Sequence, residues 1–327
     1  IRAAAGLALL LAASAAADAR ADMAQAAVPR AITRIGWIGC GVMGRPMCEK
    51  LLALGMDVHV YTRTMARAEP LIAAGAKAAS SPAEVARQSD VVFSIVSTPA
   101  DVEGVALGPD GVLAALPEAG IFCDMTTSDP ELARRLAEEA ARLGKFSLDA
   151  PVSGGDVGAQ KGTLSIMAGG DEAAFEAVRP MFARMGQNIA LLGGPGSGQS
   201  TKMANQIIIS CSMVSMCEAL QYATRAGLDV EQVIGVVSKG AAGSWSISNL
   251  APRIVAGNFD PGFKVKDFVK DLGIALRTAE TMGLQLPGLQ LAHRLYTELK
   301  DVDGHGELGT HALALAFERI NPAPSST

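Results

Sequence analysis

The feature that most constrains the fold is an alternation of strand-like and helix-like segments, which begins at Arg34 and stops near Gly194. Apolar runs such as "RIGWIG", "DVVFSIV" and "GIFCDM" alternate with capped or amphipathic segments. One such segment starts at Ser81, with Ser, Pro and Glu in the N-cap, N1 and N3 positions of a helix. Nearly continuous apolar runs are typical of strands covered on both faces. The alternation therefore predicts an α/β fold with a doubly wound parallel sheet.

The pattern changes after Ser197, where only helical periodicity remains. This region is predicted to form an all-α C-terminal domain, with helices at about 198–226, 230–239, 243–255, 264–282, 286–299 and 307–320. The first helix has few polar positions from residue 203 onward, so we expect it to be buried in its own domain or against a second subunit. A homodimer or homotetramer follows as the expected assembly.

The N-terminal segment, residues 1–33, is alanine-rich and predicts no packed domain. It resembles a secretory signal, a basic organellar leader, or sequence upstream of a true start at Met23. An organellar leader is favoured, because five cysteines without a CxxC pair suit a reducing compartment. The predicted domains are then 1–33 as leader or disordered segment, 34–196 as cofactor domain, and 197–327 as helical domain for substrate and dimerisation.

Composition excludes several classes of function. A length of 327 residues with 49% hydrophobic content allows two domains with separate cores. A net charge of −5 and 4% aromatic residues argue against a nucleic-acid partner. The four histidines form no cluster with metal-ligand spacing, so no metal is expected. The apolar run at residues 3–17 is too short and alanine-rich for a membrane span.

A glycine motif lies between the first predicted strand and helix. "GCGVMG" places Gly39, Gly41 and Gly44 in the G-x-G-x-x-G pattern, with Val42 and Met43 between them. In this context the glycines permit a tight turn, close approach of a pyrophosphate, and helix–strand contact, while the helix N-terminus favours negative charge. The motif predicts a Rossmann-type dinucleotide site; a glycine-rich turn without a ligand is the alternative.

The end of the second predicted strand indicates which nucleotide is bound. Enzymes that use NAD place a carboxylate there, whereas an arginine suits the 2′-phosphate of NADP. The chain reads Thr62, Arg63 and Thr64, with Arg67 following, and has no carboxylate in this stretch. NADP(H) is therefore predicted in preference to NAD(H), which stays possible; Arg67 could equally be a solvated helix residue.

Four motifs together resemble one family, the β-hydroxyacid dehydrogenases related to 3-hydroxyisobutyrate dehydrogenase. They are "IGWIGCGVMGRPM", "DAPVSGGDVGAQKGTLSIMAGG", "GSGQSTKMANQ" and "DPGFKVKDFVKDL", and the resemblance covers residues 34–320. Members include tartronate semialdehyde reductase and glyoxylate/succinic semialdehyde reductases. The pattern is most similar to plant and algal proteins described as mitochondrial. By analogy this implies a mitochondrial or plastid location, with the cytoplasm as the alternative.

The resemblance assigns roles in the cofactor and substrate loops. Val96 and Ser97 match positions that line the nicotinamide ribose, and Thr127 matches a cofactor contact that could also cap a helix. Ser153, Gly154 and Gly155 match the loop that holds the substrate carboxylate through backbone N–H groups and a hydroxyl. A tight turn is the alternative for that loop.

The resemblance also assigns roles in the helical domain. Lys202 matches the catalytic lysine, and Asn205 and Gln206 match its polar, substrate-binding neighbours. Many family members have Asn-Asn here, and the reductase branch often has Asn-Gln. Lys270 matches a lysine on the nicotinamide side of the site, although nearby Lys264 and Lys266 also suit a solvated helix face.

These residues imply an NAD(P)-dependent oxidoreductase of the EC 1.1.1 class that acts on a small hydroxyacid or semialdehyde. The nicotinamide carries the hydride, and Lys202 is predicted to act as general acid and base toward the hydroxyl oxygen. One alternative is a glyoxylate/succinic semialdehyde reductase that uses NADPH. A non-catalytic nucleotide-binding protein on the same fold is the other.

Overall fold

A computed structural model describes residues 32–322, so residues 1–31 of the predicted leader lie outside the described part. The described residues divide into two compact units. Unit 1 contains residues up to 126, together with 130–152 and 158–199. Unit 2 contains residues 127–129, 153–157 and everything from Ser200 onward. Two short segments thus group with the helical unit although the residues on either side of each belong to unit 1.

Unit 1 is built on a parallel sheet, as the alternation predicted. Within the described residues its strands follow the order β3-β2-β1-β4-β5-β6. In chain order the strands are β1 (Arg34–Ile38), β2 (Asp57–Tyr61), β3 (Lys77–Ala78), β4 (Val91–Ser94), β5 (Ile121–Asp124) and β6 (Phe146–Asp149). The order reverses between β1 and β4, the crevice at which doubly wound sheets bind ligands.

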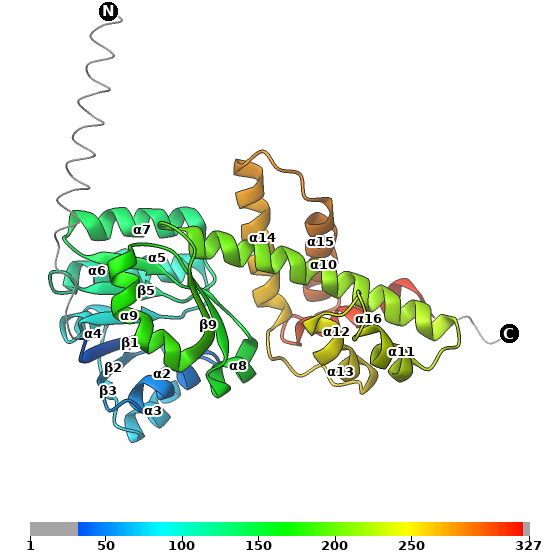
Figure 1. The fold of residues 1–327 in the computed structure, drawn as a ribbon, viewed down its shortest axis with the longest axis horizontal. Coiled ribbons are helices and arrows are strands. Elements are labelled where there is room, and N and C mark those ends of the chain that lie inside the picture. The colour runs from blue at the N-terminus through cyan, green and yellow to red at the C-terminus, as the bar shows by residue number, and fades with distance from the viewer. Residues whose placement is uncertain (1–31, 323–327) are drawn as a thin grey trace, which may run out of the picture. The chain divides into compact units, whose positions relative to one another are not determined.

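Helices cover both faces of this sheet (Figure 1). They are α2 (Gly44–Leu52), α3 (Glu69–Ala73), α4 (Pro82–Arg87), α5 (Pro99–Leu107), α6 (Val112–Ala115) and α7 (Pro130–Arg142), with the 3-10 turn η1 at Met65–Arg67. Side chains of β4 alternate between two cores: Phe93 packs in one and Val92 in the other. Burial on both faces explains why these strands appear in the sequence as continuous apolar runs.

A second sheet of three strands lies almost entirely in unit 1, with residues 153–157 grouped with unit 2. It contains β7 (Val152–Ser153), β8 (Leu164–Ala168) and β9 (Gly186–Leu191), with α8 (Gly155–Lys161) and α9 (Glu172–Met185) between them. The helix α8 was not expected from the sequence, which indicated only a glycine-rich loop. Phe182 of α9 packs edge-on against Phe93 of β4, with ring centroids 6.1 Å apart, so this sheet shares a core with the first.

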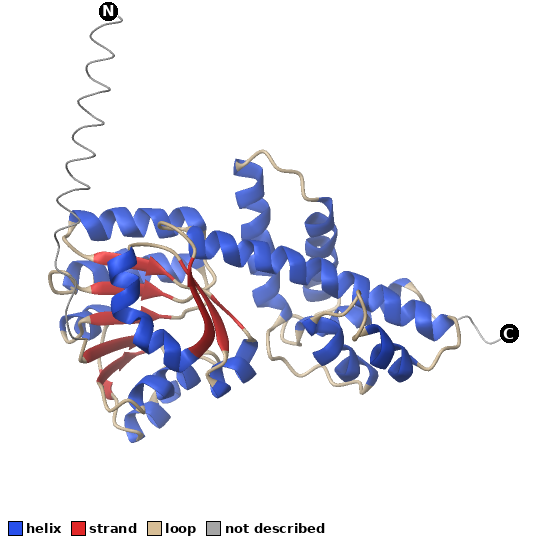
Figure 2. Ribbon diagram, in the orientation of Figure 1, coloured by secondary structure: helices blue, strands red, loops and turns tan. Residues whose placement is uncertain are grey.

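Unit 2 is helical over its described elements, and Figure 2 shows no strand arrows after β9. Its helices are α10 (Ser197–Arg225, which starts in unit 1), α11 (Val230–Val237), α12 (Trp245–Asn249), α13 (Ala251–Val255), α14 (Val265–Thr281), α15 (Pro287–Asp301) and α16 (Leu313–Ile320), with η2 at Thr310–Ala312. The predicted single helix at 243–255 is two helices. Pro252, which has no backbone N–H to donate, lies in the first turn of the second one.

The long helix α10 has a mixed environment. Met213 and Cys217 are buried in the core of unit 2, whereas Ile208 and Tyr222 are 67% and 76% exposed. By length and composition alone α10 could cross a membrane, a test that core helices of soluble proteins also pass. Burial inside one chain therefore accounts for only part of its apolar surface.

Candidate active site

The glycine turn after β1 has the geometry of a pyrophosphate site. Gly39 has φ +100°, and a Cβ there would lie 2.1 Å from the Ile95 carbonyl oxygen. A Cβ on Gly44 would lie 2.0 Å from the Gly39 oxygen, so both positions require glycine. A Cβ on Gly41 would meet nothing within 4 Å, which leaves open space where the backbone is expected to approach the phosphates.

The start of α2 also fits an anion. Met43 occupies the N-cap position without a side-chain hydrogen bond, and the first turn of the helix has no acidic residue. Val42 in the same turn is 65% exposed. The N–H groups and the positive end of the helix dipole are therefore not neutralised by a local carboxylate. The residues present fit the nucleotide that the motif predicts.

The residues predicted to read the 2′ position follow β2 directly. Thr62, Arg63 and Thr64 form the loop between β2 and η1, and Arg67 lies exposed in η1. The Arg63 guanidinium lies 2.9 Å from the Asp101 carboxylate of α5. The sequence did not predict this ion pair, because Asp101 is 38 positions away and its only local signal is a helix-capping pattern with Thr98.

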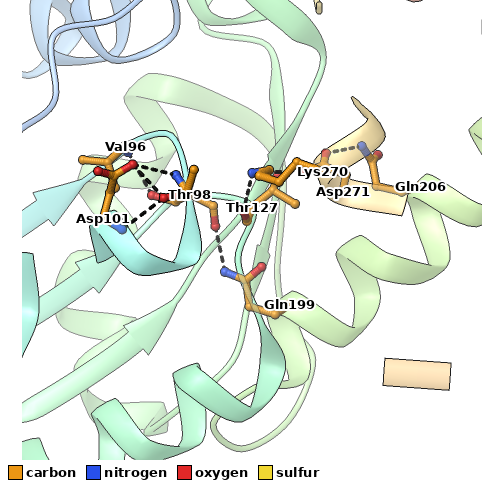
Figure 3. Close-up of polar contacts among 9 residues, drawn as sticks. Val96, Thr98, Asp101, Thr127, Gln199, Gln206, Lys270 and Asp271 are labelled. Atoms are coloured by element: carbon orange, nitrogen blue, oxygen red, sulfur yellow. Dashed lines mark hydrogen bonds and ion pairs between the residues drawn. The ribbon is translucent and has the colours of Figure 1, made fainter. Parts of the chain in front are cut away.

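Val96 and Ser97 lie in the loop between β4 and α5. The Val96 N–H donates to the Thr126 hydroxyl at 2.9 Å, a bond that fixes the loop at the carboxyl end of the sheet (Figure 3). Ser97 is exposed in the same loop. Both residues are at the edge of the sheet where doubly wound folds bind their ligands.

In unit 2, Lys202 is buried on α10, with 6% of its surface exposed. Burial lowers its pKa from 10.5 to about 8, the Asp271 carboxylate opposes this change, and the Lys270 ammonium adds to it. A lysine in this state can release and regain a proton near neutral pH.

In unit 2 a chain of polar contacts leads from Gln206 through Asp271 and Lys270 to Thr127 (Figure 3). Asn205 donates to the Gln206 side chain at 2.8 Å, and Gln206 donates to the Asp271 carboxylate at 2.6 Å. The Lys270 ammonium lies 3.1 Å from the other Asp271 oxygen and donates to the Thr127 carbonyl at 2.8 Å. Asp271 is therefore the centre of the chain, a role that was not predicted.

Asp271 is a buried carboxyl between two lysines. Burial raises its pKa, and the positive charges of Lys270 and Lys202 act against that increase. The sequence signal that could have identified it is its position in "FVKDLGIA", one residue after Lys270 on a helix with apolar neighbours. A buried carboxylate is tolerated only where cations and donors surround it.

The predicted carboxylate-binding loop lies at the end of β7. Gly154 and Gly155 both have positive φ, +130° and +63°, which only glycine adopts without strain. Ser153 precedes them and is partly buried. This loop and Thr127 belong to the same compact unit as Lys202, Asn205, Gln206 and Lys270.

Asp149, in unit 1, is a further buried residue for which the sequence predicted no role. Its carboxylate accepts hydrogen bonds from the backbone N–H groups of Gly196 and Gln199, at 2.8 Å and 2.7 Å, where α10 begins. Burial raises its pKa to about 7 even though these bonds lower it. Gln199 also donates from its side chain to the Thr126 carbonyl at 2.7 Å. Asp149 thereby holds the first turn of the helix that carries Lys202.

The fold and these residues define a class of protein. A doubly wound sheet whose first turn is built from obligatory glycines is typical of dinucleotide-binding proteins, and the helical unit contains a buried lysine with a pKa of about 8, as proton-transfer groups require. Together they describe a nicotinamide-dependent oxidoreductase.

Comparison with known proteins gives the family. Residues 34–194 match the family described as the NAD binding domain of 6-phosphogluconate dehydrogenase. Residues 196–316 match the one described as NAD-binding of NADP-dependent 3-hydroxyisobutyrate dehydrogenase. The chain belongs to the β-hydroxyacid dehydrogenase family, as its motifs predicted, and is an NAD(P)-dependent hydroxyacid dehydrogenase or reductase.

Individual relatives agree with this assignment. The chain is 52% identical over 290 residues to a probable 3-hydroxyisobutyrate dehydrogenase-like 1, mitochondrial, from Arabidopsis thaliana, covering 88% of this chain and 86% of the relative. It is 38% identical to a 2-hydroxy-3-oxopropionate reductase of Escherichia coli, covering 87% and 97%. A solved 3-hydroxyisobutyrate dehydrogenase of Mycobacterium tuberculosis with L-serine superposes with a TM-score of 0.81 at 28% identity, covering 88% and 99%.

Proposed function

We propose that the chain reduces a small semialdehyde or oxoacid to its hydroxyacid, using NADPH in preference to NADH, with Lys202 as the general acid. The observation that carries the proposal is the buried Lys202, whose pKa is lowered to about 8. At pH 7 such a lysine is about one tenth amine, whereas an ordinary lysine with a pKa of 10.5 is less than about 0.1% amine. The side chain can therefore act in both directions of the reaction.

The protein must supply the proton in reduction and remove it in oxidation. Bound nicotinamide would supply the hydride to the carbonyl carbon in reduction and accept it in oxidation. The Lys202 ammonium donates its proton to the carbonyl oxygen, which becomes the hydroxyl of the product. In the reverse direction the Lys202 amine takes the proton from that hydroxyl, so atoms and charges balance in both directions.

The other predicted residues are proposed to hold the reactants. Ser153, Gly154 and Gly155 would bind the substrate carboxylate, because consecutive glycines with positive φ present backbone N–H groups without steric obstruction. Asn205 would contact substrate next to Lys202. Gln206 would orient the side-chain amide of Asn205, because Gln206 accepts a hydrogen bond from that amide and donates one to Asp271.

The cofactor contacts are proposed on the same basis. Gly39, Gly41, Val42, Met43 and Gly44 would hold the pyrophosphate, and the open space beside Gly41 supports this. Val96, Ser97, Thr127 and Lys270 would lie along the nicotinamide half. Thr62, Arg63 and Thr64 would bind the 2′-phosphate, and this is the basis of the NADPH preference.

The experiment is an assay of NADPH and NADH oxidation against glyoxylate, succinic semialdehyde, tartronate semialdehyde and methylmalonate semialdehyde. Lys202→Ala should lower kcat about 10²–10⁴-fold, the usual contribution of a general acid, while NADPH still binds. Lys239→Ala, which removes an exposed lysine of the same unit, is the matched control. Near-normal turnover of Lys202→Ala would refute the assignment.

A reductase of the glyoxylate/succinic semialdehyde type is the specific form that the Asn205–Gln206 pair favours. The longer Gln206 side chain reaches the Asp271 carboxylate at 2.6 Å while Asn205 bonds to Gln206. The similarity to a 2-hydroxy-3-oxopropionate reductase agrees with the reductive direction. A higher kcat/KM for glyoxylate or succinic semialdehyde than for methylmalonate semialdehyde would support this form.

Location, assembly and domain roles are proposed as well. Residues 1–33 are proposed as an organellar leader, since three Arabidopsis relatives carry mitochondrial names; a fusion to a fluorescent protein tests this.

Residues 34–196 are proposed as the cofactor domain, and 197–327 as the helical domain for substrate and dimerisation. The exposed Ile208 and Tyr222 support a homodimer or homotetramer, which light scattering of the purified protein would measure.

A further inference from the structure

An ion pair connects two segments that follow different strands of the unit 1 sheet. The Arg63 guanidinium, after β2, lies 2.9 Å from the Asp101 carboxylate in the first turn of α5, after β4. The Arg63 side chain is 73% exposed and that of Asp101 is 21% exposed. The pair therefore joins a solvated partner to a more enclosed one.

The strand order gives this pair a functional position. Strand β1, which leads into the Gly39–Gly44 turn, lies between β2 and β4. The ion pair thus extends across the carboxyl edge of the sheet, from the loop on one side of the proposed pyrophosphate turn to the helix on the other. Nucleotides that bind this fold extend their adenosine half toward the end of β2.

Asp101 is held in place independently of Arg63. One of its carboxylate oxygens accepts from the Thr98 N–H at 3.1 Å and from the Thr98 hydroxyl at 2.8 Å, while the hydroxyl accepts from the Asp101 N–H at 3.1 Å. This capping box, visible in Figure 3, uses one carboxylate oxygen and leaves the other for Arg63. Asp101 is therefore fixed, and Arg63 is the partner that can move.

We propose that Asp101 is a specificity-determining residue that restrains the preference for NADPH over NADH by competing with the 2′-phosphate for Arg63. The inference rests on the proposed NADPH preference and concerns the same site. A 2′-phosphate has to draw the guanidinium away from Asp101 and meets the negative charge of the carboxylate. The 2′-hydroxyl of NADH neither competes for Arg63 nor is repelled by Asp101, because it carries no charge and can donate a hydrogen bond to a carboxylate.

The test is a binding measurement on the full-length protein without substrate. Asp101→Asn removes the charge and keeps an oxygen that can accept from Thr98. Calorimetric titration should show NADPH binding about fivefold tighter than in the wild type, the upper range for an exposed ion pair, with NADH binding unchanged or weaker. If Asp101→Asn fails to fold, Asp101→Gln retains a residue type suited to the capping box and replaces it.

Two controls separate this role from a general effect of charge. Glu103→Gln removes a second carboxylate from α5, one that pairs with Arg135 at 3.0 Å, and should leave both dissociation constants unchanged. In an Arg63→Ala background, Asp101→Asn should raise NADPH affinity by only about twofold, because the competition for Arg63 is gone and only the repulsion between the carboxylate and the 2′-phosphate is relieved. An unchanged or weaker NADPH affinity in Asp101→Asn, or an equal gain without Arg63, would overturn the inference.

The outcome is independent of turnover. Failure of the Lys202 chemistry would appear as near-normal turnover of Lys202→Ala, with the dissociation constants of the Asp101 variants unaffected. Failure of the NADPH preference itself would appear as tighter NADH binding by the wild type and no loss of NADPH affinity in Arg63→Ala.

Discussion

Substituting Asp271 with asparagine should move the pH range over which Lys202 gives up its proton. The Asp271 carboxylate raises the pKa of Lys202, against the effects of burial and of Lys270. The Asp271→Asn variant would keep a carbonyl oxygen to accept from Gln206, whose bond to the carboxylate is 2.6 Å long, but would lose the negative charge. Without that charge the ammonium is less stable, so the pKa of Lys202 falls below its value of about 8.

The size of the effect follows from the strength of a nearby opposite charge. Such a charge changes a pKa by about one pH unit or more, and one unit corresponds to about 1.4 kcal/mol. We take the lower end, because Asp271 also interacts with Lys270 at 3.1 Å. The pKa of Lys202 should therefore fall from about 8 to about 7.

Single-turnover reduction, followed by NADPH absorbance from pH 6 to pH 9, measures this change. At pH 7.5 the ammonium fraction of Lys202 drops from about three quarters to about one quarter, so reduction should slow about threefold. At pH 6 both proteins are almost fully protonated and should differ little. Oxidation of the hydroxyacid at pH 7 should accelerate about fivefold, because the amine fraction rises from about one tenth to about one half.

The matched control is Glu280→Gln, which removes an exposed carboxylate about two and a half turns further along α14. Its pH profile should coincide with that of the wild type. A profile of Asp271→Asn that stays in place or moves to higher pH would show that Asp271 does not stabilise the Lys202 ammonium. A uniform loss of rate at every pH would instead indicate a purely structural role.

The remaining predictions concern glycines and a buried acid. Gly44→Ala should lower the free energy of unfolding by about 1–3 kcal/mol in urea denaturation, since its Cβ would lie 2.0 Å from the Gly39 oxygen. Gly41→Ala should instead fold normally and lose NADPH affinity in calorimetry; intact affinity would contradict the pyrophosphate site. In the folded protein the pKa of the Asp149 carboxyl is raised to about 7, so the folded state binds the carboxyl proton more tightly than the unfolded chain does. The contribution of Asp149 to the free energy of unfolding therefore falls as the pH rises from about 4 to 7. The stability advantage of wild type over Asp149→Asn should therefore shrink by up to about 3 kcal/mol between pH 5 and 8; an advantage that grows would refute the assignment.

Local patterns were sufficient to predict the parallel sheet and the helical second domain, although not α8 or the division of the helix at 243–255. Strands such as β4 and β5 are buried on both faces, so their apolar runs are nearly continuous and indicate strands directly. The Ser81 cap was predicted from its spacing, and the structure has the Ser81 hydroxyl accepting from the Glu84 N–H. The glycine turn was also predictable from the sequence, because steric contacts at Gly39 and Gly44 require glycine at both positions.

Tertiary contacts were beyond that kind of inference. The Arg63–Asp101 pair and the Asp149 bonds to Gly196 and Gln199 join residues far apart in the chain, and nothing local marks them. Asp271 appears in the sequence as an ordinary acid beside a lysine, and only burial between two cations makes it exceptional. The structure describes the positions of the predicted site residues, while their roles stay predictions.

The passage of the chain between the two units has a consequence for protein engineering and for evolution. Thr127 and residues 153–157 group with the helical unit, although each lies between segments of the sheet unit. A chimera made by exchanging everything after residue 197 with a relative would import a new Lys202 and Lys270 but retain the old Thr127 and Ser153. Exchanging the C-terminal segment alone should therefore not transfer the substrate preference of the relative. Substitutions before and after residue 197 are expected to be correlated in evolution.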